Sequence, residues 1–159
     1  MIKKHYECLH GNLYRKKHES GLNIFIMPDK KSAKYYGALG LRYGSIDCRF
    51  IPPYGKRNII TPDATAFFIQ NIISMQYQNN LFRKYGVDDS LSNSYTTFTN
   101  TIYEFTASDN LNEYMSVLLY SVFNPRFCRE DLDTVRKNLN RKIRIYQDNA
   151  GLRVRLNLL

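Results

Sequence analysis

The chain has 159 residues, 43% hydrophobic and 14% aromatic, which suits one folded globular domain and excludes a disordered chain. Its 23 basic and 14 acidic residues give a formal net charge of +9. The positive charge is scattered in short groups, so it favours an acidic partner without singling out nucleic acid, which we do not expect to bind. Apolar runs are too short for a membrane span, no signal peptide is visible, and three sparse cysteines fit reduced thiols. We therefore expect a cytoplasmic protein with no membrane partner.

The first third of the chain has the pattern of strands. Leu13-Tyr14 and the run 22–27 flank Glu19-Ser20-Gly21, which predicts a hairpin whose second strand ends at Pro28-Asp29. The apolar, glycine-spaced segment from Tyr35 to Tyr43 predicts a third strand. A loop should follow over 44–61.

A helix is predicted next, with Thr61 as N-cap, Pro62 at the first helical position and Asp63 in the first turn. It should reach about Tyr77 and bury one face made of its apolar residues, at positions 64, 67, 68, 72 and 75.

The second half should contain a strand or hairpin over 94–107, then two helices. Asp109 is the expected cap of a helix over 111–123, ended by Asn124-Pro125. The last helix should span 129–146, with an apolar stripe at 132, 135, 139, 143 and 146. This order predicts an α+β fold over a single domain, 1–159. The tail 152–159 alternates like a strand.

Four segments, in order along the chain, resemble the insulinase/pitrilysin-type zinc peptidases, the inverzincins. They are 21–28 (G-L-N-I-F-I-M-P), 43–47 (Y-G-S-I-D), 93–103 (N-S-Y-T-T-F-T-N-T-I-Y) and 143–149 (I-R-I-Y-Q-D-N). The resemblance implies an antiparallel sheet with helices packed on one face, as in an N-terminal half-domain of the insulinase or mitochondrial-processing-peptidase type. That domain is somewhat longer and its tail is helical, so the chain is either a natural short form or truncated at its C-terminus.

The family's zinc motif, H-x-x-E-H, would lie in the helix after Thr61. By resemblance its positions hold Phe67, Gln70 and Asn71, and the third ligand position holds Lys142, 71 residues past Asn71. None of these side chains offers the imidazole or carboxylate that zinc or a general base needs. We therefore expect no catalytic residues, no metal site and no cofactor, the family's zinc having been lost.

Two details of the lost site remain open. Phe67 should continue the apolar stripe and fill the space of the metal. The ammonium of Lys142 either lies in the former metal site and donates to Asn71 or Gln70, or reaches out to solvent.

A strand beside the zinc helix binds substrate in the family, as an extra strand at the sheet edge. The matching residues here are Asn93, Ser94, Tyr95 and Thr96, which we predict to bind a peptide through backbone hydrogen bonds. The alternative is an ordinary strand rich in threonine and tyrosine.

The resemblance is strongest to bacterial paired peptidase-like proteins in which one member lacks the motif. It implies a noncatalytic, metallopeptidase-like subunit that pairs with a motif-intact relative and helps enclose a peptide, an acidic one by charge, in peptide maturation. The alternatives are an active metallopeptidase, or a stand-alone basic domain that binds peptide or nucleic acid. His5, Cys8, His10 and His18 match no compact zinc signature.

Overall fold

The computed structural model describes residues 2–6, 11–29, 31–52, 55–85, 92–151 and 154, apart from the side chains of 81–85, 92 and 146. The chain divides into two compact units, Met1–Tyr35 and Tyr36–Leu159, and each is described by itself. The expectation of one domain over 1–159 stays a prediction. Among the described residues, no helix is long and apolar enough to cross a membrane.

The first unit is a three-stranded antiparallel sheet in the order β1 (Ile2–Tyr6), β2 (Gly11–Lys17), β3 (Asn23–Ile26). The predicted hairpin is confirmed, with Tyr14 opposite Ile26 and Gly21 at φ 88° in the turn. Such a φ suits glycine because it has no Cβ to clash with the backbone. Strand β1 was not predicted, since its residues are mostly charged or polar and all but Tyr6 are exposed.

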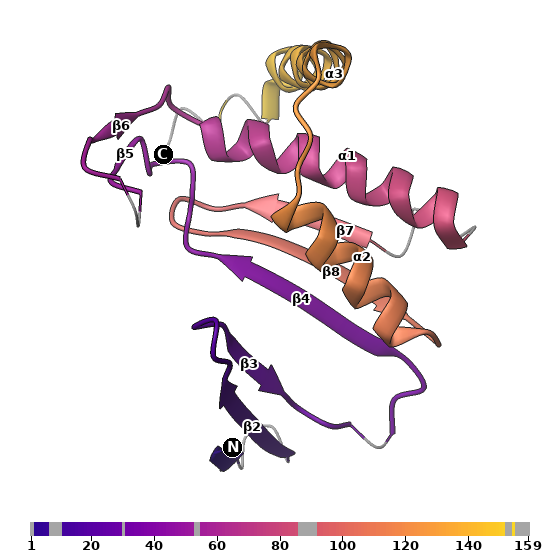
Figure 1. Ribbon diagram of the computed structural model, residues 1–159. Coiled ribbons are helices and arrows are strands. Elements are labelled where there is room, and N and C mark those ends of the chain that lie inside the picture. The colour runs from indigo at the N-terminus through magenta and orange to yellow at the C-terminus, as the bar shows by residue number, and fades with distance from the viewer. Residues whose placement is uncertain are drawn as a thin grey trace. The chain divides into compact units, whose positions relative to one another are not determined.

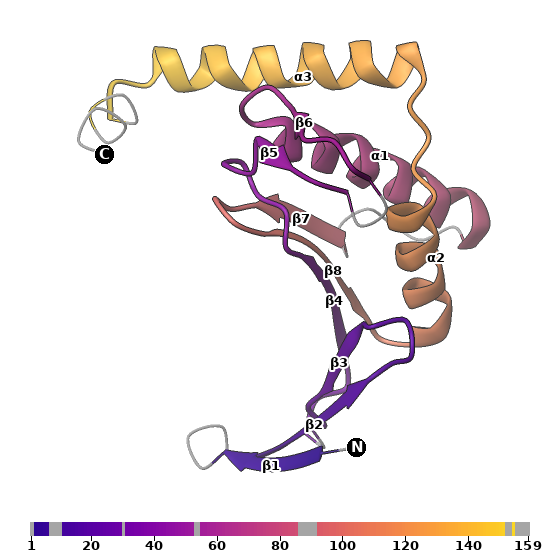
Figure 2. The ribbon, with the colours of Figure 1, turned by 60° about the vertical axis from the view of Figure 1, so that its left-hand side comes forward.

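The second unit is built on a sheet in the order β4 (Tyr35–Leu41), β8 (Thr101–Ala107), β7 (Ser92–Thr96). Helices α1 (Thr65–Tyr85) and α2 (Leu111–Phe123) pack on one face of this sheet, and α3 (Arg129–Asp148) packs against α1 (Figures 1 and 2). This confirms the α+β fold with helices on one face. The loop after β4 contains two short paired strands that were not predicted, β5 (Arg49–Phe50) and β6 (Ile59–Ile60).

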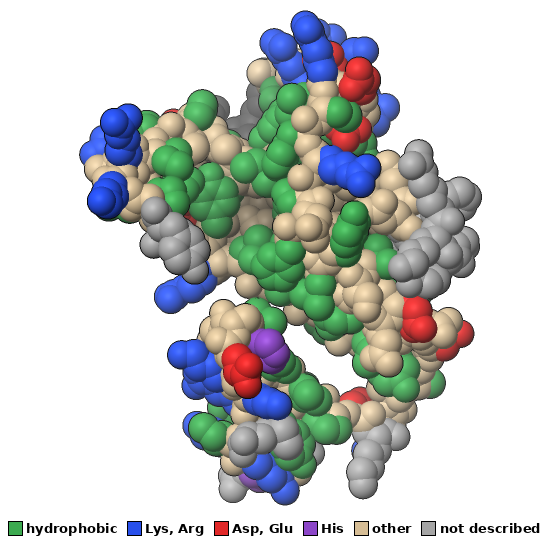
Figure 3. Space-filling view, viewed as in Figure 1, with side chains coloured by type: hydrophobic (Ala, Val, Ile, Leu, Met, Phe, Trp, Pro, Cys, Tyr) green, Lys and Arg blue, Asp and Glu red, His purple; other side chains and the backbone are tan. Residues whose placement is uncertain are grey.

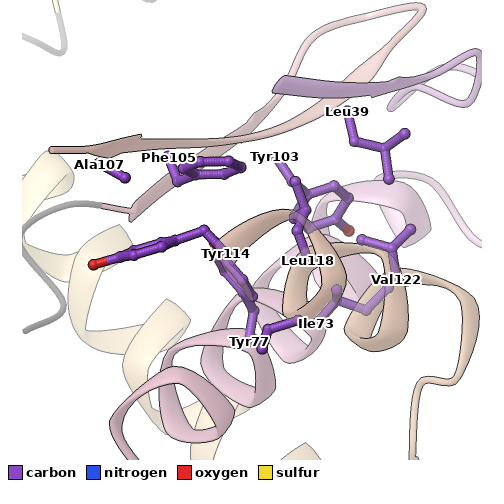
Figure 4. Close-up of a cluster of buried hydrophobic side chains, with 10 residues drawn as sticks. Leu39, Ile73, Tyr77, Tyr103, Phe105, Ala107, Tyr114, Leu118 and Val122 are labelled. Carbon is purple, nitrogen blue, oxygen red and sulfur yellow. The ribbon is translucent and has the colours of Figure 1, made fainter. Parts of the chain in front are cut away.

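The core lies between β8 and the two helices on it (Figure 4). Strand β8 alternates strictly, so Tyr103, Phe105 and Ala107 are buried on the helix side. The rings of Phe105 and Tyr114 stack with centroids 5.4 Å apart. Each large side chain buried in this way contributes about 1.5–3 kcal/mol of hydrophobic stabilisation, which fixes α1 and α2 against the strand.

The predicted start of α1 is wrong. The helix begins at Thr65, not at Pro62, because Ala64 has a left-handed backbone (φ 60°) that interrupts the helical path. Residues 62–65 form a turn in which Thr65 Oγ1 donates to the carbonyl of Pro62 at 2.6 Å. Thr61 therefore does not cap the helix, and its buried hydroxyl has no hydrogen-bond partner in the described part of the chain.

The predicted buried face of α1 is also mostly wrong. The helix buries Ala66, Gln70, Ile73 and Tyr77, which share a face, together with Ile72. Of the residues predicted to form this face, only Ile72 is buried. The apolar pattern failed because a glutamine occupies the centre of the real face, and the helix continues to Tyr85 instead of ending near Tyr77.

The later elements agree with prediction in their bounds but not in every detail. The hairpin β7–β8 and helices α2 and α3 lie within a few residues of the expected positions. The N-cap of α2 is Asn110, at φ 51°, and not Asp109. On α3 only Val135 of the predicted stripe is buried; Leu132 and Ile143 are exposed. The tail 152–159 lies outside the described residues except for Val154.

Candidate functional site

The segment 43–47 joins β4 to the turn between β7 and β8. A Cβ on Gly44 would overlap the backbone of Phe98 and Thr99, so only glycine fits this approach. Ser45 N donates to Thr97 O at 3.0 Å, and Thr101 Oγ1 donates to the carbonyl before Gly44, that of Tyr43, at 2.8 Å. The segment therefore holds the end of the hairpin in place.

The same segment also fixes the start of α1. Gly44 N donates to Asp47 Oδ2 at 2.7 Å, which closes the loop on itself. Ala64 N donates to Ser45 O at 3.3 Å, just before the first residue of the helix. Strand β7 and helix α1 are thus positioned by one short stretch of backbone.

Gln70 connects α1 directly to β7. It is buried, with 4% of its surface exposed, and its Nε2 donates to Ser94 Oγ at 2.5 Å. Its Oε1 accepts from Asn71 Nδ2 at 3.3 Å, and the same Nδ2 donates to the carbonyl of Phe67 at 2.8 Å. Both ends of the Gln70 amide are paired, as a buried polar group requires.

Among the described strands, β7 lies at an edge of its sheet and pairs with β8 alone. Thr97 N donates to Asn100 O at 2.7 Å, so these two residues form a hydrogen-bonded pair at the turn. Hydrogen-bonded and non-hydrogen-bonded pairs alternate along an antiparallel ladder. The N–H and C=O groups of Tyr95 and Asn93 therefore face β8, whereas those of Ser94 and Thr96 face the outer edge of the sheet. Ser94 and Thr96 thus present the polar groups that an added strand would use.

The side chain of Asn93 already occupies part of this edge. Its Oδ1 accepts from Ser94 N at 2.9 Å, while its Nδ2 donates to Glu104 Oε1 at 2.9 Å. The other oxygen of Glu104 accepts a hydrogen bond from the Tyr36 hydroxyl, and this bond to a carboxylate raises the pKa of Tyr36 to about 12. Glu104 therefore ties all three strands together and holds Asn93 in its position.

A pocket of about 360 Å³ opens between α1, β7 and α3. Of the described side chains that line it, two are apolar, two are cationic, the rest are neutral polar groups, and none is acidic. They are Asn71, Ser74, Met75, Gln78, Asn93, Ser94, Val135, Asn138, Arg141 and Lys142.

Helix α3 is held on the far wall of this pocket by Gln76 of α1. The Gln76 amide donates to Asp131 Oδ2 at 3.0 Å and to the carbonyl of Arg126, and it accepts from Arg126 N at 3.1 Å. These bonds fix the first turn of α3 and the segment before it. They also set which residues of α3 face α1.

The structure brings some of the predicted site residues together and leaves others apart. Asn71, Asn93, Ser94 and Lys142 line one pocket, and Gln70 is buried behind it. Tyr95 and Thr96 do not line it; Tyr95 lies on the same face of β7 as Asn93, and Thr96 on the face of Ser94.

Phe67 and Lys142 are both exposed, and of these two residues Lys142 alone lines the pocket. Phe67 is 39% exposed and does not line the pocket, so the prediction that it fills the vacated space is wrong. Lys142 is exposed, and no hydrogen bond joins it to Asn71 or Gln70, although all three side chains are described. The tethered ammonium therefore stays a hypothesis.

Sequence reasoning named only four of the ten described residues that line the pocket as site residues. Ser74 and Gln78 follow Asn71 at helical spacing on α1, and Asn138 precedes Lys142 by four residues on α3. This i, i+3, i+4 spacing of small polar residues was the available signal. It was overlooked because the predicted stripes were chosen for apolar residues alone.

The donors around the pocket do not fit a zinc ion. Zinc sites in proteins use thiolate, imidazole or carboxylate ligands, whereas these walls offer amides, hydroxyls and two cations. Within the described ranges no three His, Cys, Asp or Glu side chains gather as a metal site would require. His5 and His18 contact Asn12 and Ser20 instead, and Cys8 and His10 lie outside those ranges.

Known proteins similar to the chain are zinc proteases by name. The uncharacterized zinc protease YmfH of Bacillus subtilis is 29% identical over 150 residues, which is 94% of this chain and 35% of YmfH. The putative zinc protease AlbF of Bacillus subtilis is 26% identical over 110 residues, which is 69% of this chain and 25% of AlbF. The chain thus spans about a third or less of the length of these relatives. No protein-family model matches it.

A solved structure has the same fold. The crystal structure of a putative M16-like peptidase from Alicyclobacillus acidocaldarius matches with a TM-score of 0.77 at 21% sequence identity. The match covers 93% of this chain and 34% of that chain. It confirms the half-domain fold expected from the sequence.

Proposed function

We propose that the chain is an insulinase-type (M16) peptidase homologue that acts as a noncatalytic subunit and binds a peptide beside β7; its similarity to two proteins named zinc proteases and its M16-like fold support this. The observation that carries this proposal is the pocket at the edge of β7, whose lining includes no acid and no histidine among the described residues. A peptidase of this family needs a carboxylate base and a metal-bound water. The side chains on these walls can supply neither.

Peptide binding does not need the metal. An extended peptide can add to a sheet edge through backbone hydrogen bonds, with side chains read by neighbouring pockets. The N–H and C=O groups of Ser94 and Thr96 face the outer edge, where an added strand could bond to them. Ser94 also lines the pocket.

The proposal includes a partner, a relative with intact H-x-x-E-H that performs the cleavage. Support comes from α3, where Leu132, Ile143 and Ile145 are apolar and at least 36% exposed. Exposed apolar side chains on an amphipathic helix favour a protein contact. We assign the chain to peptide maturation through that partner.

The first prediction concerns metal, partner and activity together. The purified chain should contain no stoichiometric zinc and show no peptidase activity alone. A pull-down with the tagged chain should recover a motif-intact relative, and peptidase activity should appear in the pair. Stoichiometric zinc with activity in the isolated chain would contradict the noncatalytic role, whereas activity of the relative that is indifferent to this chain would contradict the pairing.

Strand addition can be tested separately with a short probe, Ac-Thr-Val-Gln-Val-Thr-NH₂, and its analogue N-methylated at alternate residues. If the peptide adds to β7, amide resonances of Ser94 and Thr96 should shift with the first probe and not with the second. The methyl groups remove the donors of one peptide edge without changing its side chains.

A second prediction follows from Asn93, whose Oδ1 holds the Ser94 amide that a peptide would need. Because that bond competes with the incoming strand, Asn93→Ala should raise probe affinity by about 3–10-fold, as expected for loss of one competing hydrogen bond. Thr99→Ala, in the turn beyond the strand, is the control. Weaker binding by Asn93→Ala would instead identify Asn93 as a direct contact with the peptide.

A further inference from the structure

We infer that the pocket between α1, β7 and α3 takes the side-chain carboxylate of the bound peptide, so that the chain selects acidic peptides. This inference rests on the proposed function and adds the class of peptide. The starting observation is the charge of the walls: Arg141 and Lys142 line the pocket, and none of the other described lining residues is acidic.

Both cations lack a counter-ion within the described ranges of the chain. Neither Arg141 nor Lys142 forms an ion pair or a hydrogen bond with any residue that the structure describes. A guanidinium presents a planar fork of donors that matches a carboxylate, and an ammonium adds a point charge. Two unpaired cations on one wall therefore form a site for an anionic group.

The charges of α3 are separated along the helix. Its acids lie mostly in the first turns, at Glu130, Asp131 and Asp133, and Asp131 is bonded to Gln76. The following stretch carries only basic charges, at 136, 137, 141, 142 and 144, and Lys and Arg side chains gather over α3 in Figure 3. No acid of the helix neighbours Arg141 or Lys142 within a turn, so their charge is not cancelled locally.

Neutral donors complete the site. Ser74, Gln78 and Asn138 line the pocket and have no hydrogen-bond partner among the described residues. A carboxylate accepts several hydrogen bonds, and these side chains can donate to the acceptor positions that the two cations do not use. At about 360 Å³ the pocket is at the small end of ligand sites, which suits one side chain and not a folded partner.

The pocket lies where a side chain of a peptide added beside β7 can reach it. Side chains of a strand added beside β7 alternate between the two faces of the sheet. Ser94 and Thr96 project toward the helices, since Gln70 of α1 bonds Ser94 Oγ. Peptide side chains on that face enter the space between α1 and α3, where Arg141 and Lys142 lie.

The test compares two probes that differ in one atom group, Ac-Thr-Val-Glu-Val-Thr-NH₂ and Ac-Thr-Val-Gln-Val-Thr-NH₂. Affinities for the 159-residue chain are measured by titration calorimetry at 150 mM salt. The glutamate probe should bind at least tenfold more tightly. In Arg141→Gln/Lys142→Gln this preference should fall to less than twofold, since charge-assisted bonds to the carboxylate are lost.

The matched control is Arg136→Gln/Arg144→Gln, which removes the same charge from the same helix at positions that do not line the pocket. It should keep the preference for glutamate. If both double variants lose the preference for the glutamate probe equally, the basic helix attracts acidic peptides in general, and the inference is overturned.

Additional outcomes and probes of this binding experiment distinguish failure of this inference from failure of the proposed function. Equal binding of the two probes would leave strand addition intact and overturn the acidic pocket, whereas no binding of either would overturn both. The free-acid probe Ac-Thr-Val-Gln-Val-Thr-OH distinguishes a terminal carboxylate: tighter binding than the glutamate probe would overturn the side-chain assignment. Displacement of the glutamate probe by a 20-nucleotide single-stranded DNA at stoichiometric concentration would overturn it in favour of nucleic acid.

Discussion

Replacing Gly44 by alanine is expected to lower the free energy of unfolding of the second unit by about 3 kcal/mol, the upper range for overpacking. The added Cβ would overlap backbone atoms of Phe98 and Thr99, which cannot move aside as a flexible side chain can. Those atoms are themselves held, because Ile46 N donates to Phe98 O at 3.2 Å. The whole turn must shift to accept one methyl group.

Gly40→Ala is the matched control for this experiment. Gly40 is also a glycine of the second unit, but a Cβ placed there meets no atom within 4 Å. Its substitution should change the free energy of unfolding by less than about 0.5 kcal/mol. Urea unfolding followed by circular dichroism measures both variants; equal stabilities would show that the segment 43–47 is not packed against the turn.

The effect of Gly44→Ala should extend to the candidate site. Ser45 lies between Gly44 and the start of α1, and its carbonyl accepts from Ala64 N. A displaced turn therefore shifts both β7 and the first turn of α1. The resemblance noted for the sequence 43–47 thus has a physical basis in how the backbone packs.

The sequence predicted those elements whose local signals agree with their packing. Helix α2 combines a strong apolar face with an Asn-Pro stop, and its observed bounds equal the predicted ones. Hairpin β7–β8 follows from dense threonine and tyrosine around a polar turn. In these places propensity, periodicity and stop signals all favour one structure.

Prediction failed where a left-handed residue or a buried polar contact determines where a helix starts or which face it buries. Thr61, Pro62 and Asp63 form a good helix start by type, yet the left-handed Ala64 delays α1 to Thr65. No periodicity could show that Gln70 lies on the buried face, because its partner Ser94 is 24 residues away. Such long-range pairs override local patterns.

The candidate site was only partly predictable for the same reason. Resemblance selected Asn71 and Lys142, and these two do meet at one pocket. Arg141 and Asn138 could be assigned to it only once the packing of α3 on α1 was known. The orientation of α3 depends on Gln76, a residue with no marked signal in the sequence.

Gln70→Leu is the second large effect that we expect, a loss of about 1–3 kcal/mol in the free energy of unfolding. Leucine has a similar size and gains hydrophobic burial, but it leaves the half-buried Ser94 Oγ without its donor and Asn71 Nδ2 without one of its acceptors. A polar group that loses its partner in a buried or half-buried position is destabilising because water does not fully replace that partner. Gln78→Leu on the same helix is the control, since Gln78 bonds no described residue, and it should change stability by less than about 0.5 kcal/mol.

A double-mutant cycle with Ser94→Ala decides whether the hydrogen bond itself is responsible. If it is, Gln70→Leu should cost at least about 1 kcal/mol less in the Ser94→Ala background, because no unpaired hydroxyl is left behind. Strictly additive losses would mean that Gln70 stabilises α1 by packing alone. In the first case, the amide of Gln70 fastens helix α1 to the edge strand β7 through Ser94, which is a role that a neutral side chain can fill.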